Sequence, residues 1–355
     1  MMVLSRIKET AVKITILVFF LIVAGFYSIQ AQSYDGANNG SSQPVGRSAA
    51  TNIKIATEVN VDAMPVELGN SINSPYDDIK PRITPCGNRL YFSRNNHPGN
   101  SNGVNDPEDI WYSEFDKTRN TWSEPIHMTG VLNNSGPNYI NNISATGDTL
   151  ILGNQYLKKG KMRAGLSYSV KQNGDWSVPT AIDIEGDYNM SSHSNSFVDL
   201  KNGVIIRSVE RIESIGKRDL FVSFWDGEKA TEPVNMGTVI NTGSEESSPF
   251  LASDNKTLYF ASKGHSGYGG YDIYVTKRMD DSWTNWTTPE NLGPAVNGSL
   301  DDEFFSITHD GNYAIFSKQK NVHNTDLYRI SMDVLFGNNE MPKSMKEANS
   351  SLAAL

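Results

Sequence analysis

A short phrase of tryptophan and proline recurs along the chain at an almost constant interval. The phrase reads WSEP at residues 122–125 and WSVP at 176–179, and looser copies stand at 225–233 and 286–289. The prolines that end these four copies lie 54, 54 and 56 residues apart. A fixed period of this length is typical of chains built from repeated units, each of which buries its apolar face against the next unit.

Each repeat predicts four short strands. Runs rich in β-branched and aromatic residues share the period, such as RLYFS at 89–93 and TLYF at 257–260, and turn residues such as HDGN at 309–312 lie between the runs. An aspartate opens the third run of most repeats, and we expect it to accept hydrogen bonds from backbone amides of the preceding turn. These aspartates are Asp109, Asp219, Asp272 and Asp326.

The repeats together predict an all-β fold. From residue 52 to 333 no segment shows the 3.6-residue period of an amphipathic helix. Five strand-only units of about 54 residues match a five-bladed β-propeller with four-stranded antiparallel blades. The fifth repeat has no Trp-Pro phrase after Ile330, so we expect an N-terminal strand within residues 52–63 to close the ring as the outer strand of the last blade.

The two ends of the chain differ from the repeats. Residues 1–31 combine a basic start, an apolar run and the small residue Ala31, which is the layout of a secretory signal peptide. The competing interpretation is an uncleaved anchor, but the apolar run is short for a bilayer that needs about 20 residues. Residues 32–51 predict a flexible linker and residues 334–355 a C-terminal tail. We therefore expect an exported protein that is periplasmic, associated with the outer membrane or secreted.

The composition excludes several classes of protein. The chain has 40 Asp and Glu against 31 Lys and Arg, and its net charge of −9 argues against a nucleic-acid-binding surface. The single cysteine, Cys86, excludes an intrachain disulfide framework and a CxxC site.

One stretch of the fourth repeat resembles a known family. Residues 247–262 (SSPFLASDNKTLYFAS) and 269–275 (GGYDIYV) are similar to the WD40-like propeller repeat of the TolB type, and the resemblance extends over residues 60–333. It implies a five-bladed propeller of the kind attached to OmpA-family envelope proteins and type IX secretion components of Bacteroidetes. Such relatives bind other envelope components and are mostly not enzymes. The resemblance therefore implies a non-enzymatic binding or scaffold propeller that recognises an envelope protein or a cell-wall glycan and is at most peripheral to the membrane.

Polar residues recur at the expected start of the innermost strands. These positions should converge on one mouth of the central channel, and further acids (Asp77, Glu245, Asp301 and Glu303) crowd the same rim. The residues, one per blade, are Asp78, Asn138, His193, Glu246 and Asp302. Neighbouring carboxylates repel each other by about 4 kcal/mol per pair at close range, so the rim needs compensation.

Two explanations for these rim residues stay open. They could bind a partner or a hard cation such as Ca²⁺, for which Asp78, Glu246 and Asp302 are the candidate ligands. Alternatively, they could accept hydrogen bonds from backbone amides where adjacent blades meet. No other cofactor is predicted.

The loops on the same face carry the opposite charge. An acidic mouth inside a basic collar would steer a charged partner, although basic loop residues are often only solvated. The basic residues are Arg94, Lys159, Arg163, Arg207, Lys263 and Lys318.

The alternative function is that of a carbohydrate-active enzyme resembling a glycoside hydrolase. In that case Asp78, Glu246 and Asp302 would act as acid, base or stabilising groups. Such an enzyme needs a deep pocket with aromatic side chains beside two carboxylates in unlike environments. Because the acids recur with the repeat, as a structural feature would, the sequence favours the non-enzymatic interpretation and no catalytic residue is predicted from it.

Overall fold

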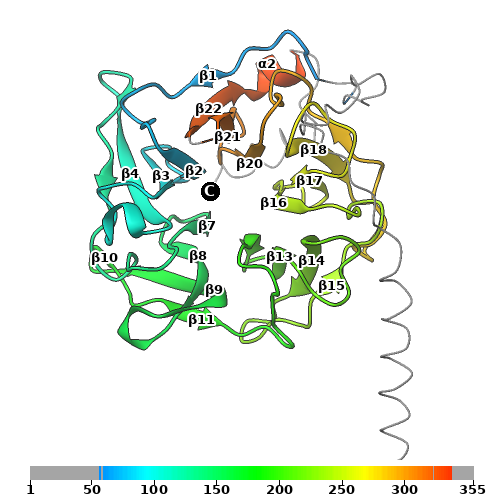
Figure 1. Cartoon of the computed structure of the whole chain (residues 1–355), viewed down its shortest axis with the longest axis horizontal. Coiled ribbons are helices and arrows are strands. Elements are labelled where there is room, and N and C mark those ends of the chain that lie inside the picture. Colours follow the sequence, from blue (N-terminus) through cyan, green and yellow to red (C-terminus); the bar gives the residue numbers. More distant parts are fainter. Residues whose placement is uncertain (1–55, 57–58, 323, 338–355) are drawn as a thin grey trace, which may run out of the picture. The chain divides into compact units, whose positions relative to one another are not determined.

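The computed structural model describes residues 56, 59–322 and 324–337, which form five β-sheet blades around a central channel (Figure 1). The predicted all-β five-bladed propeller is confirmed. The predicted signal peptide and linker lie outside the described residues, as does most of the predicted tail. Within the described part of the chain, no helix has the length and apolar character needed to cross a membrane.

The blades follow one another in sequence order, each with its innermost strand first. Blade 1 contains β2 (Asp77–Ile83), β3 (Arg89–Asn95), β4 (Asp109–Asp116), β5 (Thr121–Trp122) and β6 (Ile126–His127). Blade 2 contains β7 (Ile140–Ile143), β8 (Thr149–Tyr156), β9 (Met162–Gln172), β10 (Asp175–Trp176) and β11 (Thr180–Ile182). Blade 3 contains β12 (Asn195–Asp199), β13 (Val204–Val209), β14 (Asp219–Phe224) and β15 (Val234–Asn235).

The last two blades have the same order. Blade 4 contains β16 (Glu246–Leu251), β17 (Thr257–Ser262), β18 (Asp272–Lys277) and β19 (Glu290–Asn291). Blade 5 contains β20 (Asp302–Ile307), β21 (Tyr313–Asn321), β22 (Asn324–Ser331) and the N-terminal β1 (Val66–Glu67). Short helical turns occur at η1 (Gly103–Asn105), η2 (Lys158–Gly160) and α2 (Met332–Phe336).

An N-terminal strand closes the ring, but it is not the predicted one. Val66 pairs with Arg329 and Glu67 with Tyr328, so β1 lies beside β22 (Figure 1). The prediction of a strand within residues 52–63 is wrong for its described residues, which form no strand. In every other blade the proline of the Trp-Pro phrase stands just before the outer strand, where its missing N–H removes no ladder bond. Pro65 has this same place before β1.

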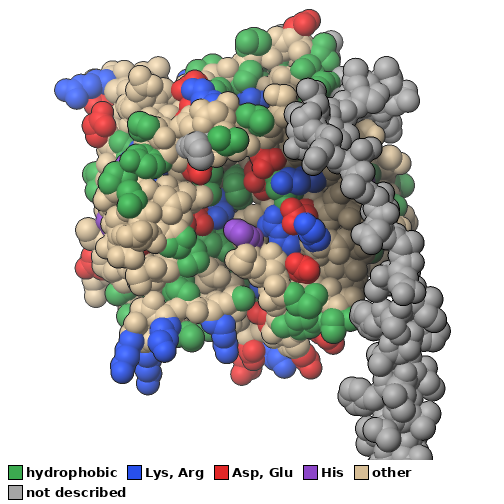
Figure 2. All heavy atoms as spheres, viewed as in Figure 1, with side chains coloured by type: hydrophobic (Ala, Val, Ile, Leu, Met, Phe, Trp, Pro, Cys, Tyr) green, Lys and Arg blue, Asp and Glu red, His purple; other side chains and the backbone are tan. Residues whose placement is uncertain are grey.

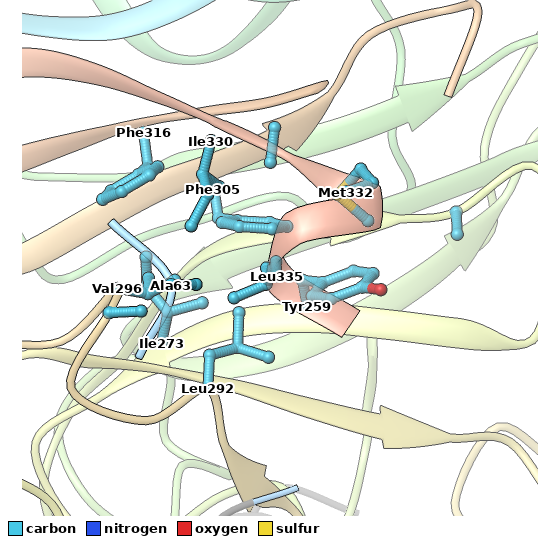
Figure 3. Packing of buried hydrophobic residues seen from close by; sticks show 13 residues of the cluster. Ala63, Tyr259, Ile273, Leu292, Val296, Phe305, Phe316, Ile330, Met332 and Leu335 are labelled. Atoms are coloured by element: carbon cyan, nitrogen blue, oxygen red, sulfur yellow. The ribbon is translucent and has the colours of Figure 1, made fainter. Parts of the chain in front are cut away.

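The core is divided into seams between neighbouring blades. In the seam between blades 4 and 5, Tyr259 stacks on Phe305 with ring centroids 4.9 Å apart, and α2 covers the seam with Met332 and Leu335 (Figure 3). Ala63, from the segment expected to form the closing strand, is buried in the same cluster. Each large apolar side chain buried in this way contributes about 1.5–3 kcal/mol.

Four of the five connections between blades, all except that from blade 2 to blade 3, are tied to the preceding blade by an asparagine that the sequence interpretation missed. Asn241, for example, accepts a hydrogen bond from the Leu220 amide at 2.8 Å and donates to the Leu220 carbonyl at 3.0 Å. The equivalent asparagines are Asn73, Asn133 and Asn297. In each case a glycine stands three or four residues before the asparagine, and an aliphatic residue stands directly before it, as in GNSIN at 69–73 and GTVIN at 237–241. This short motif recurs in phase with the repeat.

The innermost strands carry β-bulges near the channel. In β2, β16 and β20 the ladder shifts register two residues after Asp78, Glu246 and Asp302, at Lys80, Ser248 and Phe304. These three residues have φ of 54°, 50° and 59°, a conformation that is strained for side chains other than glycine. Bulges re-aim side chains and are frequent beside functional sites, and two of these residues, Lys80 and Phe304, line the cavity at the channel mouth.

Candidate active site at the channel mouth

A cavity of about 660 Å³ opens at the channel mouth and is lined by residues of all five blades. Figure 2 shows this face, with a histidine side chain near its centre and acidic and basic side chains interleaved beside it. The volume lies in the range of small-molecule sites.

Four of the five predicted mouth residues do not line this cavity. Each is buried and accepts a hydrogen bond from the backbone amide four residues earlier, which agrees with the backbone-amide explanation. The donors are the amides of Ser74, Asn134, Thr242 and Gly298, at 2.6, 2.7, 2.9 and 2.5 Å from side-chain oxygens of Asp78, Asn138, Glu246 and Asp302.

The three proposed metal ligands are not brought together. Asp78 pairs with Arg94 at 2.8 Å and Asp302 with Lys318 at 2.9 Å, while Glu246 accepts a hydrogen bond from Ser262 at 2.7 Å. Each carboxylate is therefore compensated within its own blade. Among the described residues, no group of three or more His, Cys, Asp or Glu side chains could hold a metal ion.

His193 is the one predicted mouth residue that reaches the cavity, because blade 3 is offset by one residue. β16 begins at Glu246, which pairs with Ser262 at the end of β17, whereas β12 begins at Asn195, which pairs with Ser208 rather than with Val209 at the end of β13. Ser194 therefore occupies the position of Glu246, and His193 corresponds to Glu245.

Strand alternation explains why the predicted residues point away from the channel. Successive side chains of a strand point to opposite faces, so the residues on either side of the buried one reach the cavity. The flanking residues with the chemistry of interest are Asp77, Tyr139, His193, Glu245, Asp301 and Glu303. The rim acids named beside the mouth residues are thus the ones that the cavity exposes.

A second set of cavity residues, which the sequence interpretation missed, stands one position before the repeated aspartates. Its members are Glu108, Arg218, Tyr271 and Thr325. The Arg218 carbonyl accepts a hydrogen bond from the Glu246 amide at 2.8 Å, and the Tyr271 carbonyl accepts one from the Asp302 amide at 2.8 Å. These bonds join consecutive blades, so they bring Arg218 next to Glu245 and Tyr271 next to Asp301. Strand alternation could have identified this set from the sequence. Because the repeated aspartates are buried, the residues directly before them point to the opposite face, toward the cavity.

Two of the six predicted basic loop residues are buried in blade interiors, so the prediction of a solvent-facing collar is wrong for them. Arg94 donates to the Ile72 carbonyl at 2.8 Å and lies 4.6 Å from the centroid of the Trp111 ring. Arg207 is 1% exposed and pairs with Asp187.

The other four basic residues are more accessible, but only one of them lines the cavity. Lys159, in the turn between β8 and β9, and Arg163, near the start of β9, are exposed and do not line the cavity. Lys318 is held by Asp302. Lys263 lines the cavity, 3.8 Å from Asp301 and 4.2 Å from the centroid of the Tyr271 ring.

Glu245 is held in a cationic, hydrogen-bonded environment. Tyr271 Oη donates to Glu245 Oε2 at 2.9 Å, and Arg218 Nη2 lies 3.7 Å from the same oxygen. Burial alone would raise the pKa of Glu245, but the Tyr271 hydrogen bond and the charges of Arg218 and Lys263 together lower it below its ordinary value. Glu245 is therefore ionised at neutral pH.

Glu303 lies in the opposite kind of environment, in the same cavity. Burial raises the pKa of Glu303, and the nearby charge of Arg218 and the hydroxyls of Ser247 and Ser248 oppose this shift without overcoming it. The cavity thus holds two carboxyl groups, one from blade 4 and one from blade 5, with pKa values displaced in opposite directions.

Aromatic side chains lie beside these carboxyl groups. Tyr139, Tyr271 and Phe304 line the cavity. Lys80, also in the lining, places Nζ 3.9 Å from the centroid of the Tyr139 ring and 2.6 Å from the Glu108 carboxylate. The cavity therefore combines apolar rings with charged groups that are mostly paired.

Burial also affects Asp302, with a consequence for stability. The pKa of Asp302 is raised to about 6 by burial, although the Lys318 ammonium opposes the shift. Because the unfolded value is near 3.9, the folded protein binds this proton more tightly, and the resulting stability is lost as pH rises through about 6. We expect the unfolding free energy of the wild type, relative to Asp302→Asn, to rise by up to about 3 kcal/mol between about pH 7 and about pH 4. Urea denaturation at each pH measures this difference, and a flat difference would contradict the expectation.

Comparison with known proteins gives structural matches only. No protein-family model matches the chain, and no curated protein matches it. A structure described as a complex of BT0996 and RGII superposes with a TM-score of 0.52 at 10% identity, covering 78% of this chain and 92% of that one. A structure described as "Glycoside hydrolase" has a TM-score of 0.51 at 12% identity, covering 77% and 92%. TolB from Acinetobacter baumannii matches with a TM-score of 0.43 at 13% identity, covering 74% and 56%.

These matches confirm the propeller fold and correct the functional expectation. TolB is among the similar structures, but the resemblance to OmpA-family and type IX secretion propellers is not shown by the comparisons. The prediction of a non-enzymatic envelope scaffold is contradicted, because a similar structure with a TM-score above 0.5 is described as a glycoside hydrolase. At these identities the likeness concerns the fold, so the function has to be argued from the site.

Proposed function

We propose that the chain is a carbohydrate-active enzyme that hydrolyses glycosidic bonds in the cavity at the channel mouth. The observation that carries the proposal is the pair of carboxyl groups, Glu245 and Glu303, whose pKa values are displaced in opposite directions in one cavity. Glycoside hydrolysis requires such a pair, one group protonated and one ionised. The glycoside hydrolase among the structural neighbours supports the same interpretation.

Each group has a role that its environment suits. Glu303, with its raised pKa, would donate a proton to the leaving glycosidic oxygen as the C–O bond breaks. Glu245, ionised beside Arg218 and Tyr271, would activate the attacking water or stabilise the positive charge that develops on the sugar ring. Tyr139 and Phe304 line the same cavity, with the Lys80 ammonium over both rings. These assignments replace Asp78, Glu246 and Asp302, which lie outside the cavity.

The decisive experiment is a hydrolysis assay on a panel of polysaccharides and aryl glycosides, read out as released reducing ends or as released aryl alcohol. We expect at least one substrate to be cleaved by the wild type. A blank across neutral, acidic and amino-sugar polymers, at every pH from mildly acidic to mildly basic, would remove the proposal.

We also propose that the protein works outside the cytoplasm, on a glycan of the cell wall or surroundings. The support is the signal-peptide layout of residues 1–31. Cell fractionation with an antibody against the propeller, together with N-terminal sequencing of the mature chain, tests both export and cleavage.

A further inference from the structure

A line of hydrogen bonds leads to Glu303 through the interior of two neighbouring blades. Ser248 Oγ donates to Glu303 Oε1 at 3.1 Å, and Ser247 Oγ lies 3.2 Å from Ser248 Oγ. Asn195 Nδ2 in turn donates to Ser247 Oγ at 2.9 Å. Asn195, Ser247 and Ser248, all of them buried, are called the serine relay below.

The hydrogen bonds of the relay converge on Glu303. The amide nitrogen of Asn195 can only donate, so Ser247 is its acceptor. Ser247 and Ser248 share a hydrogen bond in which either hydroxyl can donate. Ser248 donates to Glu303 Oε1, and the hydroxyls of both serines favour the ionised form of Glu303 against the effect of its burial.

We propose that the serine relay consists of positioning residues that hold the carboxyl group of Glu303 in one orientation at the cavity, through a hydrogen bond to Oε1 that favours its ionised form. This inference rests on the proposed function for its catalytic meaning, because a general acid must be held within reach of the leaving oxygen. The hydrogen bonds themselves do not depend on that function.

The bulge of β16 brings the two serine hydroxyls together. In a regular strand Ser247 and Ser248 would point to opposite faces. The bulge between Ser247 and Phe250 places Ser248 at a φ of 50°, and the two hydroxyls then come within hydrogen-bond distance on one side. The same bulge recurs at Lys80 and Phe304, so it belongs to the repeat, and in β16 it delivers a hydroxyl to Glu303.

Other ionisable groups near Glu303 also affect its pKa. Arg218, from the loop before β14, favours the ionised form, and Asp301, two residues before Glu303, favours the protonated form. The phenol of Tyr271, just before β18, interacts electrostatically with Glu303 as well. None of these three belongs to the relay, so relay variants leave them in place.

The test is a carboxyl titration of the full-length protein, which does not require a substrate. Protein labelled with ¹³C at glutamate carboxyls is followed by NMR over pH, and the Glu303 signal is assigned by its absence in Glu303→Gln. Removing the Ser248 hydroxyl takes a hydrogen bond away from the ionised form, so we expect Ser248→Ala to raise the titration midpoint of Glu303 by about one pH unit.

Two further variants separate the relay from effects of packing. Ser248→Gly also lacks the hydroxyl but relieves the strained φ, so it should show the same midpoint shift with at least wild-type stability. Ser196→Ala removes the hydroxyl of another buried serine, in β12, which has no part in the relay. That control should leave the midpoint unchanged.

The outcomes are distinguishable from those of the hydrolysis assay. A midpoint that stays at the wild-type value in both Ser248 variants overturns the relay, whether or not the protein cleaves a glycan. A shift in both Ser248 variants but not in Ser196→Ala supports it, even if no substrate is cleaved and the proposed function fails. An equal shift in Ser196→Ala would show a general packing effect and overturn it.

Discussion

Replacing Glu303 by Gln is expected to lower kcat for glycan hydrolysis by about 10²- to 10⁴-fold, the usual contribution of a general acid. Gln has the same shape, and its carbonyl oxygen can still accept the hydrogen bond from Ser248. The fold should therefore be retained while the transferable proton is lost. Initial rates on the best substrate of the polysaccharide panel measure the effect, with a thermal melt to confirm folding.

A matched variant distinguishes the structural assignment from the sequence-based one. Glu246, in blade 4, is a candidate acid or base by its place in the repeat, but it is fully buried and bonds to Thr242 and Ser262. Glu246→Gln should keep kcat per folded molecule and lower the melting temperature. If Glu246→Gln abolished activity while Glu303→Gln retained it, the assignment of Glu303 as the acid would be wrong.

Replacing Asp78 by Ala is expected to lower the unfolding free energy by about 3–5 kcal/mol. Asp78 is fully buried and pairs with Arg94, which is 7% exposed. Its removal leaves a guanidinium in the interior of blade 1 without its counter-charge, and it also removes the acceptor of the Ser74 amide. Guanidinium denaturation, monitored by tryptophan fluorescence, gives the free-energy difference.

Two comparisons test the cause of this loss. The exposed pair of Lys229 and Glu185 offers a control, because Glu185→Ala should cost less than about 1 kcal/mol. Adding Arg94→Met to Asp78→Ala should restore part of the stability, since the uncompensated charge is then gone. If the double variant were less stable than Asp78→Ala, the loss would come from packing and not from the buried charge.

The site is harder to predict from sequence than the fold, and single residues show why. Asp78, Glu246 and Asp302 stand out because they recur with the repeat. A residue that recurs in this way has a structural role common to the blades, which here is to accept a hydrogen bond from a backbone amide. Glu303 has no acidic counterpart in the other blades, where Ile79, Tyr139, Asn195 and Ser247 hold its position. A residue that serves the whole molecule need occur only once.

The sequence by itself determined the number of blades, the strand order within them and the end of the channel where polar residues gather. These features follow from short-range patterns, namely the alternation of apolar residues, the turn residues and a constant period. Only the tertiary structure decided which side chains face the cavity, because a one-residue offset or a bulge turns a side chain to the other face. It also decided that the pKa of Glu245 is lowered and that of Glu303 raised. That difference depends on burial and on two groups beside Glu245. A hydrogen bond between blades brings Arg218 to Glu245, and the folding of blade 4 brings Tyr271 to it.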